Sequence, residues 1–178
     1  SNARFYLSLN VSPTHILKAN LTERLLLILN NFRIKPAQLR LEITENTLLE
    51  DKDKASKQLR KLKNAGFKLL LDDFGTGYSS LTYLKRMPVQ HLKIDKQFIR
   101  DLLVNEEDTR IANTIIDLGK SLNLTVVAEG VETAEQEYYL TQRGCKLAQG
   151  YFFSKPLLPR DFETFVAGFH EKLVENNA

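Results

Sequence analysis

The sequence has little of several residues that define particular classes of protein. It has one cysteine, Cys145, which excludes an internal disulfide framework and a thiolate metal cluster. Its three histidines are scattered, which argues against a histidine-rich zinc site. No run approaches the roughly 18 apolar residues of a membrane span, and nothing resembles a signal peptide. We therefore expect a cytoplasmic segment without membrane contact, which leaves open a membrane anchor elsewhere in a longer parent protein.

The composition is that of an ordinary globular domain. The chain has 178 residues, of which 43% are hydrophobic and 26% charged, and we expect one domain over residues 4–178. Ser1, Asn2 and Ala3 resemble the remnant of a cleaved expression tag. The net charge of +3 is mild, and the bases between residues 52 and 63 alternate with apolar positions at helical spacing. We interpret them as a solvated helix face and expect no DNA or RNA partner.

Strand-like and helix-like segments alternate along the chain. Apolar residues at helical spacing follow each strand, and Thr133 with Gln136 predicts a capping box at the start of one helix. The pattern predicts six βα units. The expected strands are residues 5–10, 39–44, 68–72, 91–95, 125–129 and 147–149.

Alternation of this kind predicts parallel strands, because each return must cross over through a helix. Either an open doubly wound sheet or a barrel is compatible with it. An open sheet concentrates its polar residues at one switch point, whereas a barrel places them around the rim. Polar residues here lie at or near the carboxyl end of every expected strand, which favours the barrel. They are Asn10, Glu42, Asp72, Asp73, Lys93, Glu129 and Gln149.

The expected barrel is incomplete. A whole barrel has eight units and usually about 250 residues, so six units predict a fragment that lacks roughly two. Residues 5–10 would then form an unpaired edge with a hydrophobic face. We expect such chains to pair or swap elements through this edge, which predicts a homodimer.

Carboxylates that converge on one rim repel each other unless cations or protons lie between them. Oxygen ligands such as Asp72 and Asp73 suit Mg²⁺ or Mn²⁺, and two such ions are the usual arrangement for phosphodiester cleavage. A structural alternative is that the two aspartates cap the turn after Gly75 while Glu42 pairs with Lys93. The number of ionisable groups on separate strands favours the functional interpretation.

Six motifs together resemble one family. In order they are LSLNVSP (residues 7–13), LEITE (41–45), LLDDFGTGYSSL (70–81), LKID (92–95), AEGVET (128–133) and QGYFFSKP (149–156). The series resembles the EAL domain of bacterial cyclic di-GMP phosphodiesterases. The resemblance implies an α/β fold, a modified TIM barrel with one antiparallel strand. It also implies metal-dependent hydrolysis of cyclic di-GMP to the linear dinucleotide pGpG.

The resemblance also implies roles for the rim residues. Asn10, Glu42 and Asp72 would bind one metal ion, and Asp73 would contact a second ion or its bridging water. Lys93 would hold the attacking water or stabilise charge. Glu129 would be a general base or an acid close to the metal. Gln149 would form a hydrogen bond near the water.

Further residues would shape the loops and the substrate pocket. Glu45 would brace the loop at residues 73–80, with a role as a helix amino-terminal acid as its alternative. Phe152 and Pro156 would border a guanine, although Phe152 could instead belong to the core. Asp95 and Glu132 are the other substrate-binding candidates.

The sequence departs from the family in one respect, because the Glu-Ala-Leu triplet that names the family does not occur in it. In the family the triplet would precede Arg4, and its glutamate is a metal ligand. Losing even an outer partner of a metal costs roughly 10- to 100-fold in affinity or activity. We therefore expect this chain by itself to be inactive. The alternatives are a receptor for cyclic di-GMP that does not cleave it, or a scaffold. An upstream sensor or GGDEF domain is possible in the parent.

Overall fold

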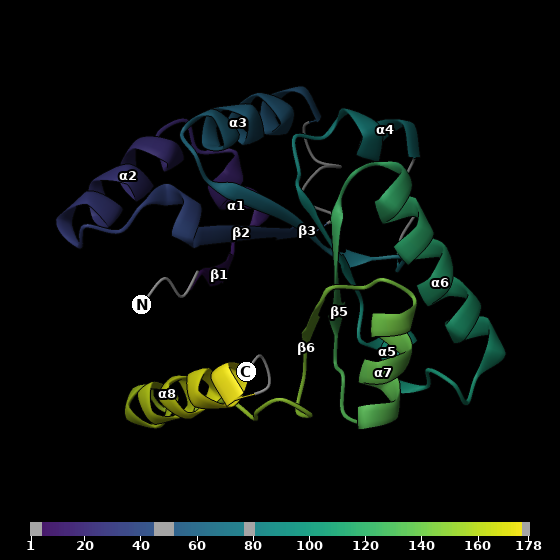
Figure 1. Cartoon of the computed structure of the whole chain (residues 1–178). Coiled ribbons are helices and arrows are strands. Elements are labelled where there is room, and N and C mark those ends of the chain that lie inside the picture. The colour runs from purple at the N-terminus through teal and green to yellow at the C-terminus, as the bar shows by residue number, and fades with distance from the viewer. Residues whose placement is uncertain (1–4, 45–51, 77–80, 176–178) are drawn as a thin grey trace.

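The structure, a computed structural model, describes residues 5–44, 52–76 and 81–175. Six strands form one curled sheet in which neighbours in the chain are neighbours in space (Figure 1). All five pairings are parallel, so the described strands form a half-barrel and the predicted fold class is confirmed. The antiparallel strand that the resemblance implies is not among them. The strands are β1 (Leu7–Asn10), β2 (Leu39–Thr44), β3 (Lys68–Phe74), β4 (His91–Ile94), β5 (Thr125–Glu129) and β6 (Leu147–Gln149).

Helices follow the strands and surround the outer side of the sheet (Figure 1). Three one-turn segments, α1, η1 and α5, were not predicted, because a single turn is too short to show a helical period. None of the described helices is long and apolar enough to cross a membrane. The helices are α1 (Pro13–Ile16), α2 (Leu21–Asn31), the 3₁₀ turn η1 (Pro36–Gln38), α3 (Lys52–Asn64), α4 (Leu81–Arg86), α5 (Gln97–Arg100), α6 (Glu106–Ser121), α7 (Ala134–Gln142) and α8 (Pro159–Glu175).

The capping box predicted at the start of α7 is confirmed. The Thr133 hydroxyl accepts a hydrogen bond from the Gln136 backbone N–H at 3.2 Å, and the Gln136 side-chain oxygen accepts from the Thr133 N–H at 3.2 Å. The same oxygen accepts from the Glu132 N–H at 2.8 Å, so one glutamine fixes the β5–α7 connection. Since this connection starts at the carboxyl end of β5, the cap also helps to position that end.

The two faces of the sheet have different chemistry. Side chains alternate between the faces of a strand, so Leu41 and Ile43 of β2 point one way while Arg40 and Glu42 point the other. The first pair is fully buried in the hydrophobic core with Leu59 of α3 and the other helices. The second pair faces the inside of the half-barrel. The core therefore lies between sheet and helices, and polar groups gather on the inner face.

The first strand is an open edge. β1 pairs with β2 on one side and with no other described strand on the other, and Leu7 remains 59% exposed. The helix α8 lies apart from the other helices, near the amino-terminal segment (Figure 1), and the Phe162 ring lies 5.6 Å from that of Phe5. The exposed hydrophobic edge agrees with the expectation from the sequence, while pairing between copies stays a prediction.

Candidate metal centre

A buried lysine lies among three carboxylates from three other strands. Lys93 Nζ is 3.1 Å from Glu42 Oε2, 3.3 Å from Asp72 Oδ1 and 3.4 Å from Glu129 Oε2. The four residues come from β4, β2, β3 and β5, one from each strand. Parallel pairing in near register brings these positions together on the inner face. Together with Asp73, described below, we call them the carboxylate centre.

The ion pair between Glu42 and Lys93, expected under the structural alternative, is present, but it is one of three contacts that Lys93 makes. One ammonium cannot balance three carboxylates. Burial raises the pKa of Asp72 to about 6, with the charge of Glu42 adding to this effect and Lys93 opposing it. Burial by itself lowers the pKa of Lys93, but the three carboxylates together raise it above its ordinary value. The centre therefore keeps a protonated lysine and an excess of negative charge.

The chain bends between Asp72 and Asp73. Regular alternation would direct these neighbours to opposite faces. The register of β3 with β4 instead shifts between Leu71 and Phe74, and Asp73 has a φ of 54°, which is uncommon for a residue with a side chain. As a result, carboxylate oxygens of Asp72, Asp73 and Glu129 all lie within 4.8 Å of one another. A backbone irregularity thus adds a carboxylate to the centre.

A further carboxylate lies next to Asp73. Burial raises the pKa of Asp73, and the charge of Asp95 together with a hydrogen bond between the two side chains raises it further. Asp95 is held in turn, because its Oδ1 accepts the backbone N–H of Gln97 at 2.8 Å. This candidate substrate-binding residue therefore lies beside the candidate ligand of the second metal ion.

The donor set fits a hard divalent cation. Every candidate ligand atom within 4.8 Å of its neighbours is a carboxylate oxygen, and Mg²⁺ and Mn²⁺ prefer such ligands. Burial is the largest cause of the raised pKa values of Asp72 and Asp73, and the negative charge of neighbouring carboxylates adds to it; a bound cation would favour the ionised form of both groups. The chemistry of the described side chains is thus compatible with the metal-binding role expected from the sequence.

The two amide candidates lie beside the centre by strand register. Asn10 of β1 is aligned with Glu42, and Gln149 of β6 is aligned with Glu129. Both are exposed. The Gln149 carbonyl accepts the backbone N–H of Gly130 at 2.8 Å, which ties the end of β6 to the loop after β5. A Cβ on the following Gly150 would overlap the backbone of Val131, so this close approach requires glycine.

The remaining candidates lie in exposed loops. Phe152 is 42% exposed and packs edge-on against Phe153 with ring centroids 5.2 Å apart, so its alternative assignment to the core is wrong. Phe152 lies in the turn after β6, where its backbone N–H donates to the Val131 carbonyl at 3.0 Å. Glu132 and Pro156 are exposed as well. Glu45 and residues 77–80 lie outside the described residues, so the proposed bracing of that loop is untested.

Fold and site together define a class of protein, an α/β half-barrel with an acidic centre at the carboxyl ends of its strands. The family model that matches is the EAL domain, over residues 1–156. The chain belongs to the EAL domain family, as the resemblance in the sequence indicated.

Known relatives of the chain include a curated protein and solved structures. The chain is 40% identical over 156 residues to the bifunctional diguanylate cyclase/cyclic di-GMP phosphodiesterase MucR of Pseudomonas aeruginosa, covering 88% of this chain and 23% of that protein. The structure of the PaMucR phosphodiesterase in complex with c-di-GMP is 39% identical with a TM-score of 0.86, covering 91% of this chain and 66% of that chain. A manganese and cy-diGMP complex of Klebsiella pneumoniae BlrP1 is 34% identical with a TM-score of 0.79, covering 86% of this chain and 40% of the other. The chain spans about a fifth of the length of the curated relatives it matches first.

Proposed function

We propose that this domain hydrolyses cyclic di-GMP to the linear dinucleotide with the help of Mg²⁺ or Mn²⁺. The observation that carries the proposal is the meeting of three carboxylates within 4.8 Å beside a buried lysine. The cyclic di-GMP phosphodiesterase activity in the name of the MucR relative and the manganese in the Klebsiella complex support it.

The ligands would divide into two sets. Asn10, Glu42 and Asp72 lie on neighbouring strands β1, β2 and β3 and would hold one ion. Asp73, with Asp95 beside it, would hold the second. Divalent cations at such a site neutralise phosphate charge and lower the pKa of water.

The protein's own groups would then position and transfer protons. The ammonium of Lys93 is fixed by three carboxylates and can donate a hydrogen bond to a water or to a phosphate oxygen. Glu129 is partly exposed, unlike Glu42, so its carboxylate can face the substrate and accept a proton from the attacking water. Gln149, aligned with Glu129, would orient that water by hydrogen bonding.

Residues farther out would contact the nucleotide. Phe152 exposes its ring at the end of the sheet where Gln149 lies and could stack on a guanine, with Pro156 nearby in the chain. Glu132 would offer a carboxylate to a guanine edge. Glu45 would link the metal centre to the following loop.

The domain would work within a larger assembly. The diguanylate cyclase activity in the name of the MucR relative supports a GGDEF-type cyclase or another upstream domain in the parent protein. The exposed edge of β1, with Leu7 and Leu9 on its surface, supports a homodimer formed through that edge. Light scattering that gives a monomer at high micromolar concentration would contradict the dimer.

The test is hydrolysis of cyclic di-GMP with Mn²⁺, followed as the appearance of the linear dinucleotide by chromatography. The assay uses this chain alone and this chain joined to the amino-terminal part of the EAL domain of the MucR relative. We expect cleavage by the joined protein, loss of 10²-fold or more with Glu129→Gln, and little cleavage by the chain alone. Binding without cleavage by the joined protein would indicate a receptor instead, and neither binding nor cleavage would overturn the proposal.

A further inference from the structure

A cavity lined by basic and aromatic side chains lies at the other end of the inner face, near the amino-terminal ends of the strands. It has a volume of about 470 Å³. Four of the eight residues that line it are basic or histidine, and none of the eight is acidic. We call it the cationic pocket, and its lining residues are Phe5, Tyr6, Lys35, Ala37, Gln38, Arg40, Lys68 and His91.

Arg40 is the central residue of the cationic pocket. It lies on the same strand and face as Glu42, two positions earlier, and is 7% exposed. Its guanidinium stacks on the Tyr6 ring, with Cζ 3.7 Å from the ring centroid. Its Nε is buried and has no hydrogen-bond partner. A buried guanidinium donor without an acceptor is costly, so this arginine lacks the group that would complete its environment.

His91 adds a second unsatisfied group. It is 9% exposed, and its Nδ1 is buried without a hydrogen-bond partner. Burial, followed by the charge of Arg40 and to a smaller extent that of Lys68, lowers the pKa of His91 to about 4. The imidazole is therefore neutral at physiological pH; its one N–H donates to the Leu69 backbone, which leaves Nδ1 as an acceptor without a partner. Two buried polar side chains thus line one cavity, and each has one nitrogen without a hydrogen-bond partner.

Two lysines complete the positive lining. Lys68 of β3 is aligned with Arg40 of β2, and Lys35 precedes the turn η1. Both are exposed, so their ammonium groups can reach an anion at the mouth of the cavity. No ion pair joins either lysine, or Arg40, to a carboxylate within the described part of the chain.

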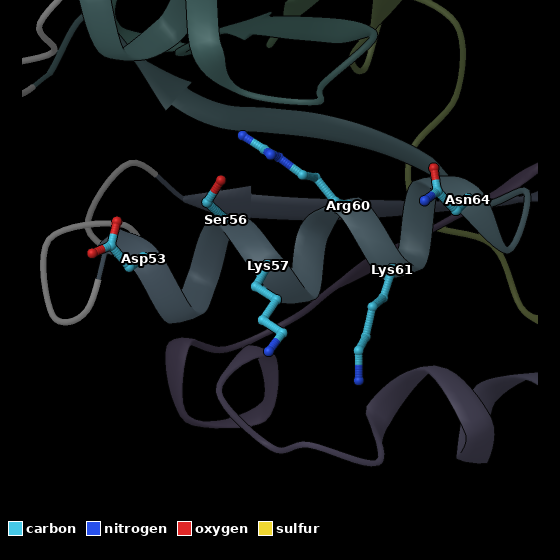
Figure 2. A pocket seen from close by; sticks show the side chains of 6 residues that line it. All are labelled: Asp53, Ser56, Lys57, Arg60, Lys61 and Asn64. Atoms are coloured by element: carbon cyan, nitrogen blue, oxygen red, sulfur yellow. The ribbon is translucent and has the colours of Figure 1, made fainter.

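The helix α3 offers an informative contrast. Its outer surface carries Lys57, Arg60 and Lys61 around a shallow depression of about 400 Å³ that Asp53 also lines (Figure 2). These bases are exposed and spread along the helix, as the sequence predicted for a solvated face. They resemble the cationic pocket in charge, but they lack its buried and unsatisfied guanidinium donor. This surface is therefore a matched control for non-specific attraction of anions.

We propose that the cationic pocket binds a small phosphate-bearing anion, with Arg40 as its main ligand. A phosphate dianion supplies several acceptors for the unsatisfied Arg40 Nε, beside the neutral ring of His91. Lys68 and Lys35 would add charge at the mouth of the cavity. The volume of 470 Å³ exceeds a bare phosphate and leaves room for a small organic group beside the rings of Phe5 and Tyr6. This site is separate from the carboxylate centre and does not depend on the proposed hydrolysis.

The test is calorimetric titration of the whole chain with inorganic phosphate, and separately with ribose 5-phosphate, in a chloride buffer without metal at pH 7.5. We expect saturable binding of one anion per chain, tighter for ribose 5-phosphate if the natural ligand is organic. Arg40→Met should weaken binding roughly 10-fold or more, since it removes a charge-assisted hydrogen bond. Lys68→Gln, at an exposed position that should not affect folding, should weaken it about threefold.

Two further measurements locate the anion. The His91 ring resonances in nuclear magnetic resonance spectra should shift on addition of phosphate, and those of His15 should not. The triple variant Lys57→Ala, Arg60→Ala, Lys61→Ala should bind as the unchanged protein does. The proposal is overturned if no saturable binding occurs below about 10 mM, or if the α3 variant weakens binding as much as Lys68→Gln does. If Arg40→Met does not fold, Lys35→Gln combined with Lys68→Gln still decides the result.

Discussion

The carboxylate centre and the cationic pocket lie on the same face of the sheet, and on β2 and β4 their residues are two positions apart. Glu42 and Lys93 belong to the first, and Arg40 and His91, two positions earlier, to the second. In the carboxylate centre the lysine contacts three carboxylates. In the cationic pocket, Arg40 Nε and His91 Nδ1 have no partner.

This difference shows two ways in which a barrel interior can hold charge. The carboxylate centre includes its own ammonium, so it can remain folded without a metal ion although a negative excess remains. The cationic pocket has no internal counter-charge among the described residues, so its completion depends on a ligand or on another part of a protein. Of the four predictions that follow, three change one side of this comparison at a time, and the last changes the exposed surface of α3 as a reference for both.

The largest effect is expected from Lys93→Met. This substitution leaves Glu42 and Asp72 buried without their ammonium, and breaking such a pair typically costs about 3–5 kcal/mol. Urea denaturation of the metal-free chain at pH 7.5 measures the loss. Arg100→Ala is the control, since the Arg100 side chain forms an exposed pair with Asp101 at 3.0 Å and its removal should change stability by less than about 0.5 kcal/mol. A loss below 1 kcal/mol for Lys93→Met would show that the carboxylates are not held by the lysine.

The second prediction concerns His91 and low pH. Its folded-state pKa of about 4 lies below the ordinary value of 6.5, so below pH 6.5 the unfolded chain binds a proton that the folded chain does not. The neutral His91 ring therefore leaves the free energy of unfolding unreduced above pH 6.5. As the pH falls towards 4, the free energy of unfolding decreases by up to about 3 kcal/mol. Denaturation in chloride buffers between pH 4 and 7 should show this loss, and His91→Phe should reduce it. If the two proteins lose stability identically between pH 7 and 4, the loss does not come from His91.

The third prediction concerns Asp72 in the metal-free chain. Its folded-state pKa of about 6 lies above the ordinary value of 3.8, so the folded chain loses stability as the pH rises from 3.8 to 6. Asp72→Asn removes this titration and should stabilise the chain above pH 6 by about 2 kcal/mol, with no gain below pH 3.8. Saturating Mn²⁺ should reverse the order, because it stabilises the unchanged protein by binding. If Asp72→Asn destabilises the metal-free chain at pH 8, the raised folded-state pKa of Asp72 is contradicted.

The smallest effect is expected on α3. Lys57→Ala and Lys61→Ala remove bases from the exposed surface in Figure 2 and should each change stability by less than about 0.5 kcal/mol. Thermal denaturation measures this. Losses above 1 kcal/mol would mean that these bases make contacts comparable to those of the buried charges.

Much of the half-barrel could be predicted because its elements follow simple periods. Alternation of strand and helix fixed the parallel order, and polar residues at strand ends located Glu42, Asp72, Lys93 and Glu129 on one rim. The proximity of Asp73 to Asp72 was expected from adjacency, but the cause, a register shift and a positive φ, leaves no periodic signal. Asp95 was expected at the substrate, and its contact with Asp73 depends on the same bend.

The cationic pocket was missed for a different reason. Arg40 and His91 lie two residues before Glu42 and Lys93, so strand alternation alone places them on the same inner face. Barrel active sites lie at the carboxyl ends of the strands, so polar residues there predict a site, whereas polar residues at the amino-terminal ends carry no such expectation. The missing hydrogen-bond partners of Arg40 and His91 depend on three-dimensional packing, which no sequence pattern reports.

The most direct test of the metal centre is calorimetric titration of Mn²⁺ into the whole chain at pH 7.5, beside the double variant Asp72→Asn, Asp73→Asn. A hard-cation site built from these carboxylates predicts saturable binding of one or two ions to the unchanged chain and a loss of at least 10-fold in affinity in the variant. Arg40→Met, which leaves the carboxylate centre intact, should bind Mn²⁺ as the unchanged chain does. Equal Mn²⁺ affinity in the double variant and the unchanged chain would contradict the assignment of these carboxylates as metal ligands.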